Sequence, residues 1–225
     1  LLASAKTGVL STASASAGAG GGHPSGSVVQ FALLEESPTS SSSSAVAPVL
    51  ALSSLSAHTR DLAADPRCSL TVLSPGFAGM EDGRVSLACV ARRLSGGEKK
   101  EGSGGSEDEQ RAARACYRQK HPDAFWSDFG DFSWWRLDLV GEEEEKRTSL
   151  PAARVVMGFG RAGSLSAAEL AGAAPDPVSP FSAPVAGHMN ADHGDADPPA
   201  EPVGDVQVRR RGGSERDEVL ARGHF

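Results

Sequence analysis

Two histidines and two aspartates lie within the stretch GHMNADHGDA, residues 187–196. Neutral imidazole is a common axial ligand of heme iron, so His188 or His193 could hold a heme. Zinc is an alternative, but the spacing of His188, Asp192 and His193 is not a standard zinc signature and offers no fourth ligand. A hydrolytic dyad would need a nucleophile that the stretch lacks. The remaining interpretation is a helix start with histidines on its surface, and we expect no metal-ion site.

A second polar group, Ser56, His58, Thr59 and Arg60, falls in the first turn of a predicted short helix. A helix amino terminus offers free N–H groups and a dipole worth about 0.3–1 kcal/mol to an anion. Hydroxyls add donors, and an arginine can bind a phosphate through two hydrogen bonds. The group could therefore hold a phosphate. Alternatively, Ser56 only caps the helix and Arg60 lies on the surface.

Aromatic side chains are concentrated just after a predicted helix. They are Trp126, Phe129, Phe132, Trp134 and Trp135. Such a group either lines a ligand cleft or belongs to the core. Arg136 follows directly and could face an anionic group of a ligand or a carboxylate of the protein itself.

The bulk composition limits the classes of function. The chain has 225 residues, is 39% hydrophobic and carries a net charge of −7. Because binding to a phosphate backbone needs a basic surface, we expect no nucleic-acid partner. No apolar run reaches the ~20 residues of a membrane span. The cysteines form no CxxC pair, which favours reduced thiols in a soluble intracellular protein. The chain starts at Leu1 rather than a methionine, so we expect its natural amino terminus to be missing.

Short strands are the main elements that would position these groups. Alternating apolar residues predict strands at 7–12, 25–34, 48–53, 68–74, 83–94, 133–142 and 151–159. In the strand at 83–94, the side chains of Val85, Leu87, Cys89 and Ala91 should share one buried face.

Helices and fillers complete the pattern. A short helix should begin near Ser56 and end before Pro66, a longer one should span 107–120, and a third, capped by Ser166 and Glu169, should lie within 164–172. We expect 142–145 to be a solvated loop. The segments 13–22, 37–45 and 96–107 are predicted to be flexible insertions.

These elements predict a mainly β fold with flanking helices, an antiparallel barrel or sandwich. We expect one domain over 1–172, followed by a tail at 173–225 that is rich in proline and glycine and has little apolar periodicity.

Five stretches occur in an order that resembles a known family. They are GHPSGSVVQFAL, LALSSLSAHTRDLAADPRCSLTVL, HPDAFWSDFGDFSWWRLDL, GFGRAGSLSAAEL and GHMNADHGDA. Together they resemble the FMN-binding split-barrel family related to pyridoxamine 5′-phosphate oxidase, and within it the branch of HugZ-like heme-utilisation proteins and their plastid relatives. The resemblance implies a six-stranded antiparallel split β-barrel, CREG-like in type. It also implies a homodimer with cofactor sites at the interface.

The resemblance further implies a set of cofactor-binding residues. In flavin-binding members, the second strand and the helix after the third strand hold the FMN phosphate. The corresponding residues here are Ser27, Val28, Val29, Ser53, Ser56, His58, Thr59 and Arg60. The oxidases have a Ser-Arg-Lys cluster where this chain has Ser56-Ala57-His58. The loss of fixed cations weakens the case for FMN, and we do not expect a true pyridoxamine-phosphate oxidase.

The same resemblance gives a context to the first stretch. In the family, HMNADH opens a small α/β domain, and in some heme-degrading members a histidine of this region binds the iron. His188 and His193 are thus the heme candidates. The polar sequence that follows predicts that 187–196 begins a truncated domain.

Two classes of function follow from the resemblance. The first is an FMN- or heme-binding split-barrel protein, oxidoreductase-like or involved in heme and tetrapyrrole metabolism; if it is an enzyme, it would depend on flavin or heme, and its catalytic residues are unknown. The second is a non-catalytic module that binds an enzyme of tetrapyrrole synthesis, as some plastid relatives do. A plastid location is an expectation from the resemblance alone.

Overall fold

The computed structural model describes residues 1–15, 22–35, 46–94, 107–158, 161–173 and 188. The chain divides into two units, Leu1–Ala173 and Ala174–Phe225. In the second unit only His188 is described. The predicted insertion at 37–45 lies outside the described residues, as do most of the tail and all of the predicted insertion at 96–107 except Glu107, which belongs to a helix.

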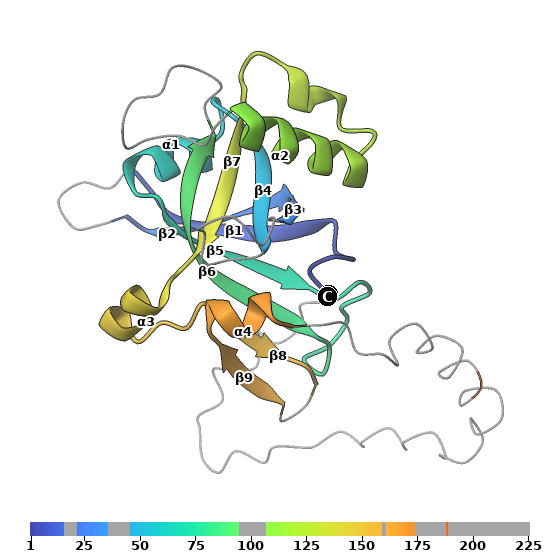
Figure 1. Cartoon of the computed structure of the whole chain (residues 1–225), viewed down its shortest axis with the longest axis vertical. Coiled ribbons are helices and arrows are strands. Elements are labelled where there is room, and N and C mark those ends of the chain that lie inside the picture. Colours follow the sequence, from blue (N-terminus) through green and yellow to red (C-terminus); the bar gives the residue numbers. More distant parts are fainter. Residues whose placement is uncertain (16–21, 36–45, 95–106, 159–160, 174–187, 189–225) are drawn as a thin grey trace, which may run out of the picture. The chain divides into compact units, whose positions relative to one another are not determined.

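The first unit is built on one antiparallel sheet (Figure 1). Its strands are β1 (Thr7–Ala13), β2 (Pro24–Gln30), β3 (Ala32–Glu35), β4 (Val46–Ser53), β5 (Arg67–Leu73), β6 (Arg84–Leu94), β7 (Phe132–Leu139), β8 (Ala153–Val156) and β9 (Ala162–Leu165). Seven of them follow the order β2-β1-β5-β6-β7-β4-β3 and form a curled half-barrel, while β8 pairs with β6 and β9 with β8. The mainly β, antiparallel class is confirmed.

The expected count of six strands is not confirmed, and one predicted strand is divided. The run 25–34 forms β2 and β3, which are separated by Phe31 alone. β2 pairs with β1, whereas β3 pairs with β4, so the chain changes its partner at this residue. The Phe31 ring is fully buried, and the backbone N–H of this residue donates to the carbonyl of Lys6. Residues 31–34 are all apolar, with no glycine or proline to mark the break, which is why the sequence pattern did not reveal it.

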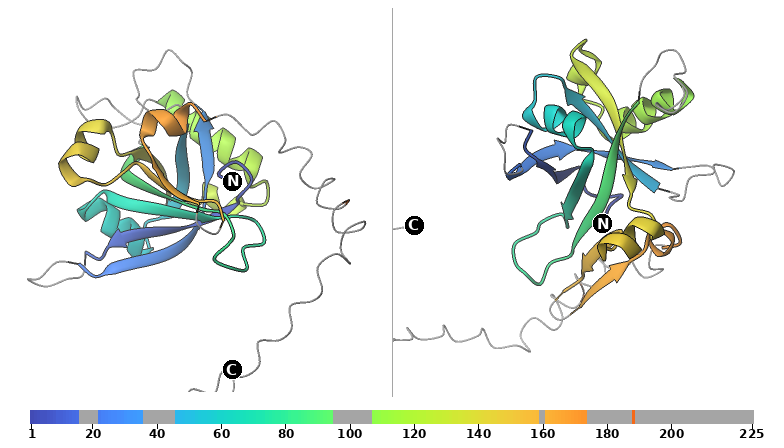
Figure 2. Two further views of the ribbon diagram at one scale, coloured as in Figure 1. Left: turned by 90° about the horizontal axis from the view of Figure 1, so that it is seen from below. Right: turned by 90° about the vertical axis from the view of Figure 1, so that its left-hand side faces the viewer.

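Five helices accompany the sheet in the described residues (Figures 1 and 2). They are α1 (Ala57–Ala64), α2 (Glu107–Lys120), the 3-10 helix η1 (Phe125–Asp128), α3 (Glu142–Thr148) and α4 (Ala167–Ala171). The predictions of α1, α2 and α4 are confirmed. α1 stops just before Asp65 and Pro66, as proline requires. Ser166 and Glu169 form the expected reciprocal capping box of α4.

The prediction that 142–145 is a loop was wrong, because α3 begins at Glu142. Its first turn is entirely acidic, which complements the positive end of the helix dipole. Lys146 and Arg147 bind Glu143 and Glu144, each one turn earlier. The helix buries no residue, so it lacks the apolar stripe on which the prediction of amphipathic helices relies.

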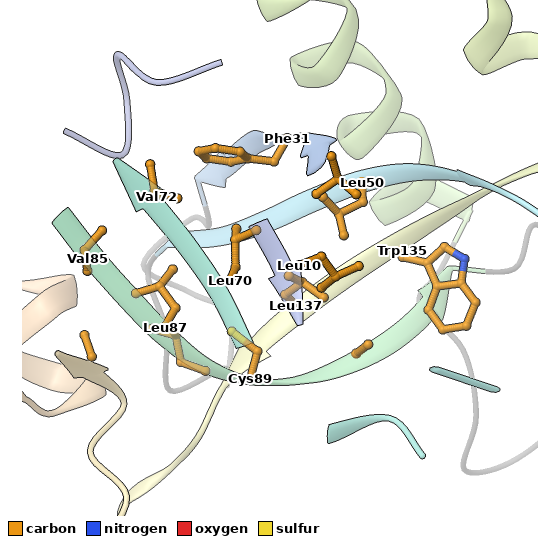
Figure 3. Packing of buried hydrophobic residues seen from close by; sticks show 14 of the residues in the cluster. Leu10, Phe31, Leu50, Leu70, Val72, Val85, Leu87, Cys89, Trp135 and Leu137 are labelled. Atoms are coloured by element: carbon orange, nitrogen blue, oxygen red, sulfur yellow. The ribbon is translucent and has the colours of Figure 1, made fainter. Parts of the chain in front are cut away.

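The core lies inside the curl of the sheet (Figure 3). The predicted buried face of β6 is confirmed, since Val85, Leu87, Cys89 and Ala91 are at most 6% exposed. A second apolar cluster lies under α2, where Ala113 and Tyr117 pack with residues of β3, β4 and β7, including Trp134. Burial of this kind contributes roughly 25 cal/mol per Å² of apolar surface, and it is the main force that holds α2 on the sheet.

The end of α2 is pinned to the junction between β2 and β3. The His121 ring lies with its Nε2 atom 2.9 Å from the carbonyl oxygen of Phe31. The Tyr117 hydroxyl donates to Oε1 of Gln30 at 3.3 Å, and the Lys120 ammonium lies 4.3 Å from the centre of the Phe31 ring. Three polar side chains of the helix end therefore hold the point where the strand changes partner.

We expect acid to weaken this junction. Burial lowers the pKa of His121 below its ordinary value of 6.5, so the folded protein keeps the ring neutral. Below about pH 6.5 the unfolded chain binds a proton that the folded chain does not. The free energy of unfolding should therefore fall as the pH drops below about 6.5. Above that pH the contribution of His121 to stability should be fully present. In His121→Gln, whose amide can still donate to Phe31, this fall should become shallower in denaturant titrations.

The exposed His23 offers a matched control, since His23→Gln should leave the pH dependence as it is. His58 also has a lowered pKa, so some acid sensitivity should persist in His121→Gln. A pH dependence that is the same in His121→Gln and in the parent protein would contradict the role of His121.

Candidate functional site

The three residues expected to contact a cofactor from β2 point to both faces of the sheet. Ser27 pairs with the fully buried Leu10, and Val29 is 7% exposed, so both face inward. Val28 pairs with Val9 on the outer face and is 75% exposed. Successive side chains of a strand alternate between faces, so one ligand cannot meet all three side chains. A ligand on the outer face would meet the side chain of Val28.

The turn between β4 and α1 uses two of the expected phosphate donors internally. The Ser53 hydroxyl donates to Oδ2 of Asp131 at 2.5 Å, and the Thr59 hydroxyl donates to the carbonyl of Ser53 at 2.7 Å. The backbone N–H of Ser54 also donates to the carbonyl of Asp131. The Asp131 carboxylate thus occupies the place at which the Ser53 hydroxyl would meet a phosphate, and its charge repels one.

The remaining donors of the first turn of α1 are few. Burial lowers the pKa of His58, against the opposing effect of Asp61, so the ring is neutral at pH 7 and adds no positive charge. The Ser56 side chain makes no capping hydrogen bond. Arg60 is exposed and forms no ion pair with any described residue. A phosphate would therefore find one hydroxyl and one guanidinium here, together with the helix N–H groups.

α1 is held in place by a buried carboxylate that the sequence analysis did not single out. Asp61 is 4% exposed. Its Oδ2 accepts from the Thr12 hydroxyl at 2.9 Å, and its Oδ1 accepts from the N–H of Ala15 at 2.8 Å. Both partners come from the end of β1, far away in the sequence, so no local pattern could have identified the role of Asp61. The contact fixes the helix against the β1 end of the sheet.

A pocket of about 560 Å³ opens on the outer face of the sheet, and no residue of α1 belongs to its lining. It is lined by Ser4, Ala5, Lys6, Thr7, Gly8, Val9, Val28, Thr71, Leu73, Ser74, Pro75, Gly76 and Phe77. Of the eight residues expected to bind a cofactor, only Val28 belongs to this lining. The structure therefore separates the expected strand contact from the donors on α1. The pocket itself was not predicted, although outward-facing valines on neighbouring strands are a signal for such a surface.

The aromatic group is divided between core and surface. Trp134 and Trp135 are 7% and 6% exposed and belong to opposite core clusters. Phe125 and Phe129 are 67% and 52% exposed, and both lie edge-on to a neighbouring ring. Arg136 is 3% exposed and binds the carboxylates of Glu109 and Asp138, which supports the second interpretation of this residue.

Metal ligands do not gather in the described part of the chain. Within it, no three histidine, cysteine, aspartate or glutamate side chains lie close enough to hold an ion. Burial raises the pKa of the Cys68 thiol to about 12, so this group stays protonated. His188 is exposed and helical, while His193 lies outside the described residues. Among the helices that are described, none has both the length and the apolar character needed to cross a membrane.

Comparison with known proteins identifies the fold family. Residues 1–140 match the family model described as CREG, beta-barrel. The chain belongs to this family, and the resemblance to split-barrel proteins is confirmed. Campylobacter jejuni ChuZ, 16% identical with a TM-score of 0.50, shares the fold over 74% of this chain and 56% of its own.

Two relatives are more similar in sequence. The first is "Non-canonical heme oxygenase HOZ, chloroplastic" of Arabidopsis thaliana, which is 37% identical over 174 residues, or 76% of this chain. The second is a heme binding protein from Mycobacterium smegmatis, 32% identical over 85% of this chain with a TM-score of 0.60. The chain spans 45% of the length of the plant relative and 65% of the bacterial one.

We expect the Asp131 carboxylate to limit any binding of FMN at α1. Replacing Asp131 by Asn should strengthen FMN binding about two- to fivefold, because a surface repulsion of roughly 0.5–1 kcal/mol is removed. Arg60→Ala should weaken the same binding. The measurement is a titration of FMN fluorescence.

Asp123→Asn is the control, because Asp123 is an exposed carboxylate with no contact to Ser53. Equal FMN affinity in the parent, Asp131→Asn and Arg60→Ala proteins would remove α1 as the phosphate site.

Proposed function

We propose that this chain is a heme-binding split-barrel protein that acts in heme or tetrapyrrole metabolism. The observation that carries the proposal is the sequence similarity to two heme-associated proteins over three quarters or more of the chain. The plant relative is a chloroplast protein by its name, so we also propose a plastid location. Pairing into a homodimer is part of the proposal and rests on the family resemblance.

Heme fits the described residues better than FMN does. FMN needs a phosphate site, and at α1 the Ser53 and Thr59 hydroxyls are engaged while Asp131 adds negative charge. Heme needs instead an axial ligand for its iron, and neutral imidazole is a common one. When bound, heme supplies the redox chemistry at its iron, while the chain binds and orients it and limits access of water.

Three histidines are candidates to hold the heme iron. His188 and His193 remain the candidates predicted from the sequence. The structure adds His58, which is half-buried and neutral, and whose ring forms no hydrogen bond with a described residue. His121 is less accessible to a heme, because it is only 5% exposed and its Nε2 lies against the carbonyl of Phe31.

Heme titration of single variants tests this proposal. The parent protein should develop a Soret band on addition of heme. One of His58→Ala, His188→Ala and His193→Ala should shift that band and weaken heme binding at least about tenfold, equivalent to about 1.4 kcal/mol. His23→Ala should behave like the parent.

The two parts of this proposal can fail separately. A parent protein without a Soret band would contradict heme binding as such. A band that none of the three substitutions alters would retain heme binding and eliminate these imidazoles as ligands.

A second candidate function is a non-catalytic module that binds an enzyme of tetrapyrrole synthesis. It is favoured by an aromatic patch, which we define as Phe125, Trp126 and Phe129. The rings of Phe125 and Trp126 lie 5.5 Å apart, and those of Phe125 and Phe129 lie 5.8 Å apart. Exposed aromatic side chains of this kind often dominate the binding energy of protein interfaces.

Substitution of the aromatic patch distinguishes this second function. The double variant Phe125→Ser with Phe129→Ser should weaken binding to a purified enzyme of tetrapyrrole synthesis at least about tenfold, because each ring would bury a large apolar surface at an interface. Heme absorbance should not change. The control is Met80→Ser, since Met80 is also 67% exposed but lies between β5 and β6 rather than on η1. Undiminished binding by the double variant would exclude the patch as the interface.

A further inference from the structure

The pocket on the outer face is formed by three adjacent strands and two flanking segments. Val28 of β2 lies opposite Val9 of β1, which in turn lies opposite Thr71 of β5. Residues directly opposite one another in an antiparallel pair share a face, so these three form one continuous floor. The segment around Lys6 makes one wall, and the turn after β5 makes the other.

The turn that forms the second wall is tight. It passes through Gly76 at φ +77°, a conformation that side chains with a Cβ rarely adopt. The N–H of Phe77 closes the turn by donating to the carbonyl of Ser74 at 3.1 Å. Phe77 belongs to the lining and is half-buried. The wall is thus fixed by backbone hydrogen bonding before any ligand arrives, which is the usual state of a small-molecule site.

The lining combines an apolar floor with a single charged side chain. Val9, Val28, Leu73 and Phe77 supply the apolar surface, and Val28 is 75% exposed without a ligand. Lys6 is the only charged residue of the lining. Ser4, Thr7, Thr71 and Ser74 add hydroxyl groups to the lining, of which the Ser4 hydroxyl donates to the carbonyl of Leu1 and the Thr71 hydroxyl is hydrogen-bonded to that of Ser86. This arrangement suits a ligand with a broad apolar body and a carboxylate.

The lining also lacks every side chain that binds heme iron. It contains no histidine, cysteine, methionine or tyrosine. Heme iron in proteins is held by side chains of these kinds. Recognition in this pocket must therefore depend on the apolar body and the acid group of a ligand, and not on a metal.

We propose that this pocket binds a metal-free tetrapyrrole carboxylate, with the ring on Val28 and Phe77 and a carboxylate paired with Lys6. The choice of a tetrapyrrole rests on the proposed function, whereas the apolar acid rests on the lining itself. A volume of about 560 Å³ falls within the usual range for sites of small ligands and cofactors. On this proposal the protein binds two kinds of ligand at separate places. Heme is held by an imidazole on its iron, and the metal-free ring is held by this pocket.

The test is a fluorescence titration of the full chain with metal-free protoporphyrin IX. The parent protein should bind the porphyrin. Val28→Glu, which places a carboxylate in the apolar floor, and Lys6→Met, which removes the cation, should each weaken binding at least tenfold. The three substitutions His58→Ala, His188→Ala and His193→Ala should leave porphyrin binding unchanged.

Two control variants match these changes away from the pocket. Val90→Glu adds a carboxylate to an exposed position of β6, and Lys146→Met removes an exposed cation from α3. Both should bind porphyrin like the parent, and thermal unfolding should show that all variants fold. Porphyrin affinity that is equal in Val28→Glu, Lys6→Met and the controls would overturn the proposal, as would a parent that binds no porphyrin. Failure of heme binding would appear separately, as the absence of a Soret band in the parent.

Discussion

A single residue joins the two edges of the seven-stranded path. β2 lies at one end of the order β2-β1-β5-β6-β7-β4-β3 and β3 at the other, yet only Phe31 separates them in the chain. In a flat sheet the two edges would be about 29 Å apart, at ~4.8 Å for each of six strand spacings. One residue spans only about 3.5 Å. The sheet must therefore curl until its edges meet, and the barrel remains split where β2 and β3 diverge.

This constraint explains the contacts that gather around Phe31. The Phe31 ring is fully buried. The backbone N–H of Phe31 donates to the carbonyl of Lys6, and its backbone carbonyl lies within hydrogen-bond distance of the His121 ring. The end of α2 is thereby attached to the split, and Ala113 and Tyr117 on the same helix complete the second core cluster. The curl also turns one face of β2, β1 and β5 outward. Val28 and Val9 lie exposed or half-buried on that face because the core is on the other side.

The sequence predicted those features that depend on local periodicity. The buried face of β6 follows from strict alternation, and the end of α1 follows from Pro66. The break at Phe31 could not be predicted, because no glycine, proline or polar residue of 31–34 marks the point at which the pairing partner changes. The helix α3 was also missed, since its stability comes from charge pairs and not from an apolar stripe.

Prediction of the candidate site from the sequence was limited in the same way, because it could not reveal contacts between distant segments. The donors Ser53 and Thr59 were correctly placed at a turn leading into a helix, but what their hydroxyls bind was not visible in the sequence. The Ser53 hydroxyl donates to Asp131, the residue just before β7, which the pairing of β4 with β7 brings alongside. A carboxylate supplied from so far along the chain thus engages one of the hydroxyls that the sequence offers to an anion. Residue types can therefore indicate a site whose chemistry depends on distant partners.

The internal use of polar groups determines where chemistry can occur. Among the described residues, no buried side-chain nitrogen or oxygen lacks a hydrogen-bond partner. Asp61 accepts a hydrogen bond from Thr12, and His121 is hydrogen-bonded to the backbone of Phe31. Arg136 forms ion pairs with Glu109 and Asp138. Changing such a group would leave a buried polar partner unsatisfied, at a cost of about 1–3 kcal/mol, so these residues are committed to stability. In the part of the chain that the structure describes, the cations considered as possible ligand contacts, Lys6 and Arg60, both lie at the surface, where a bound ligand can reach them.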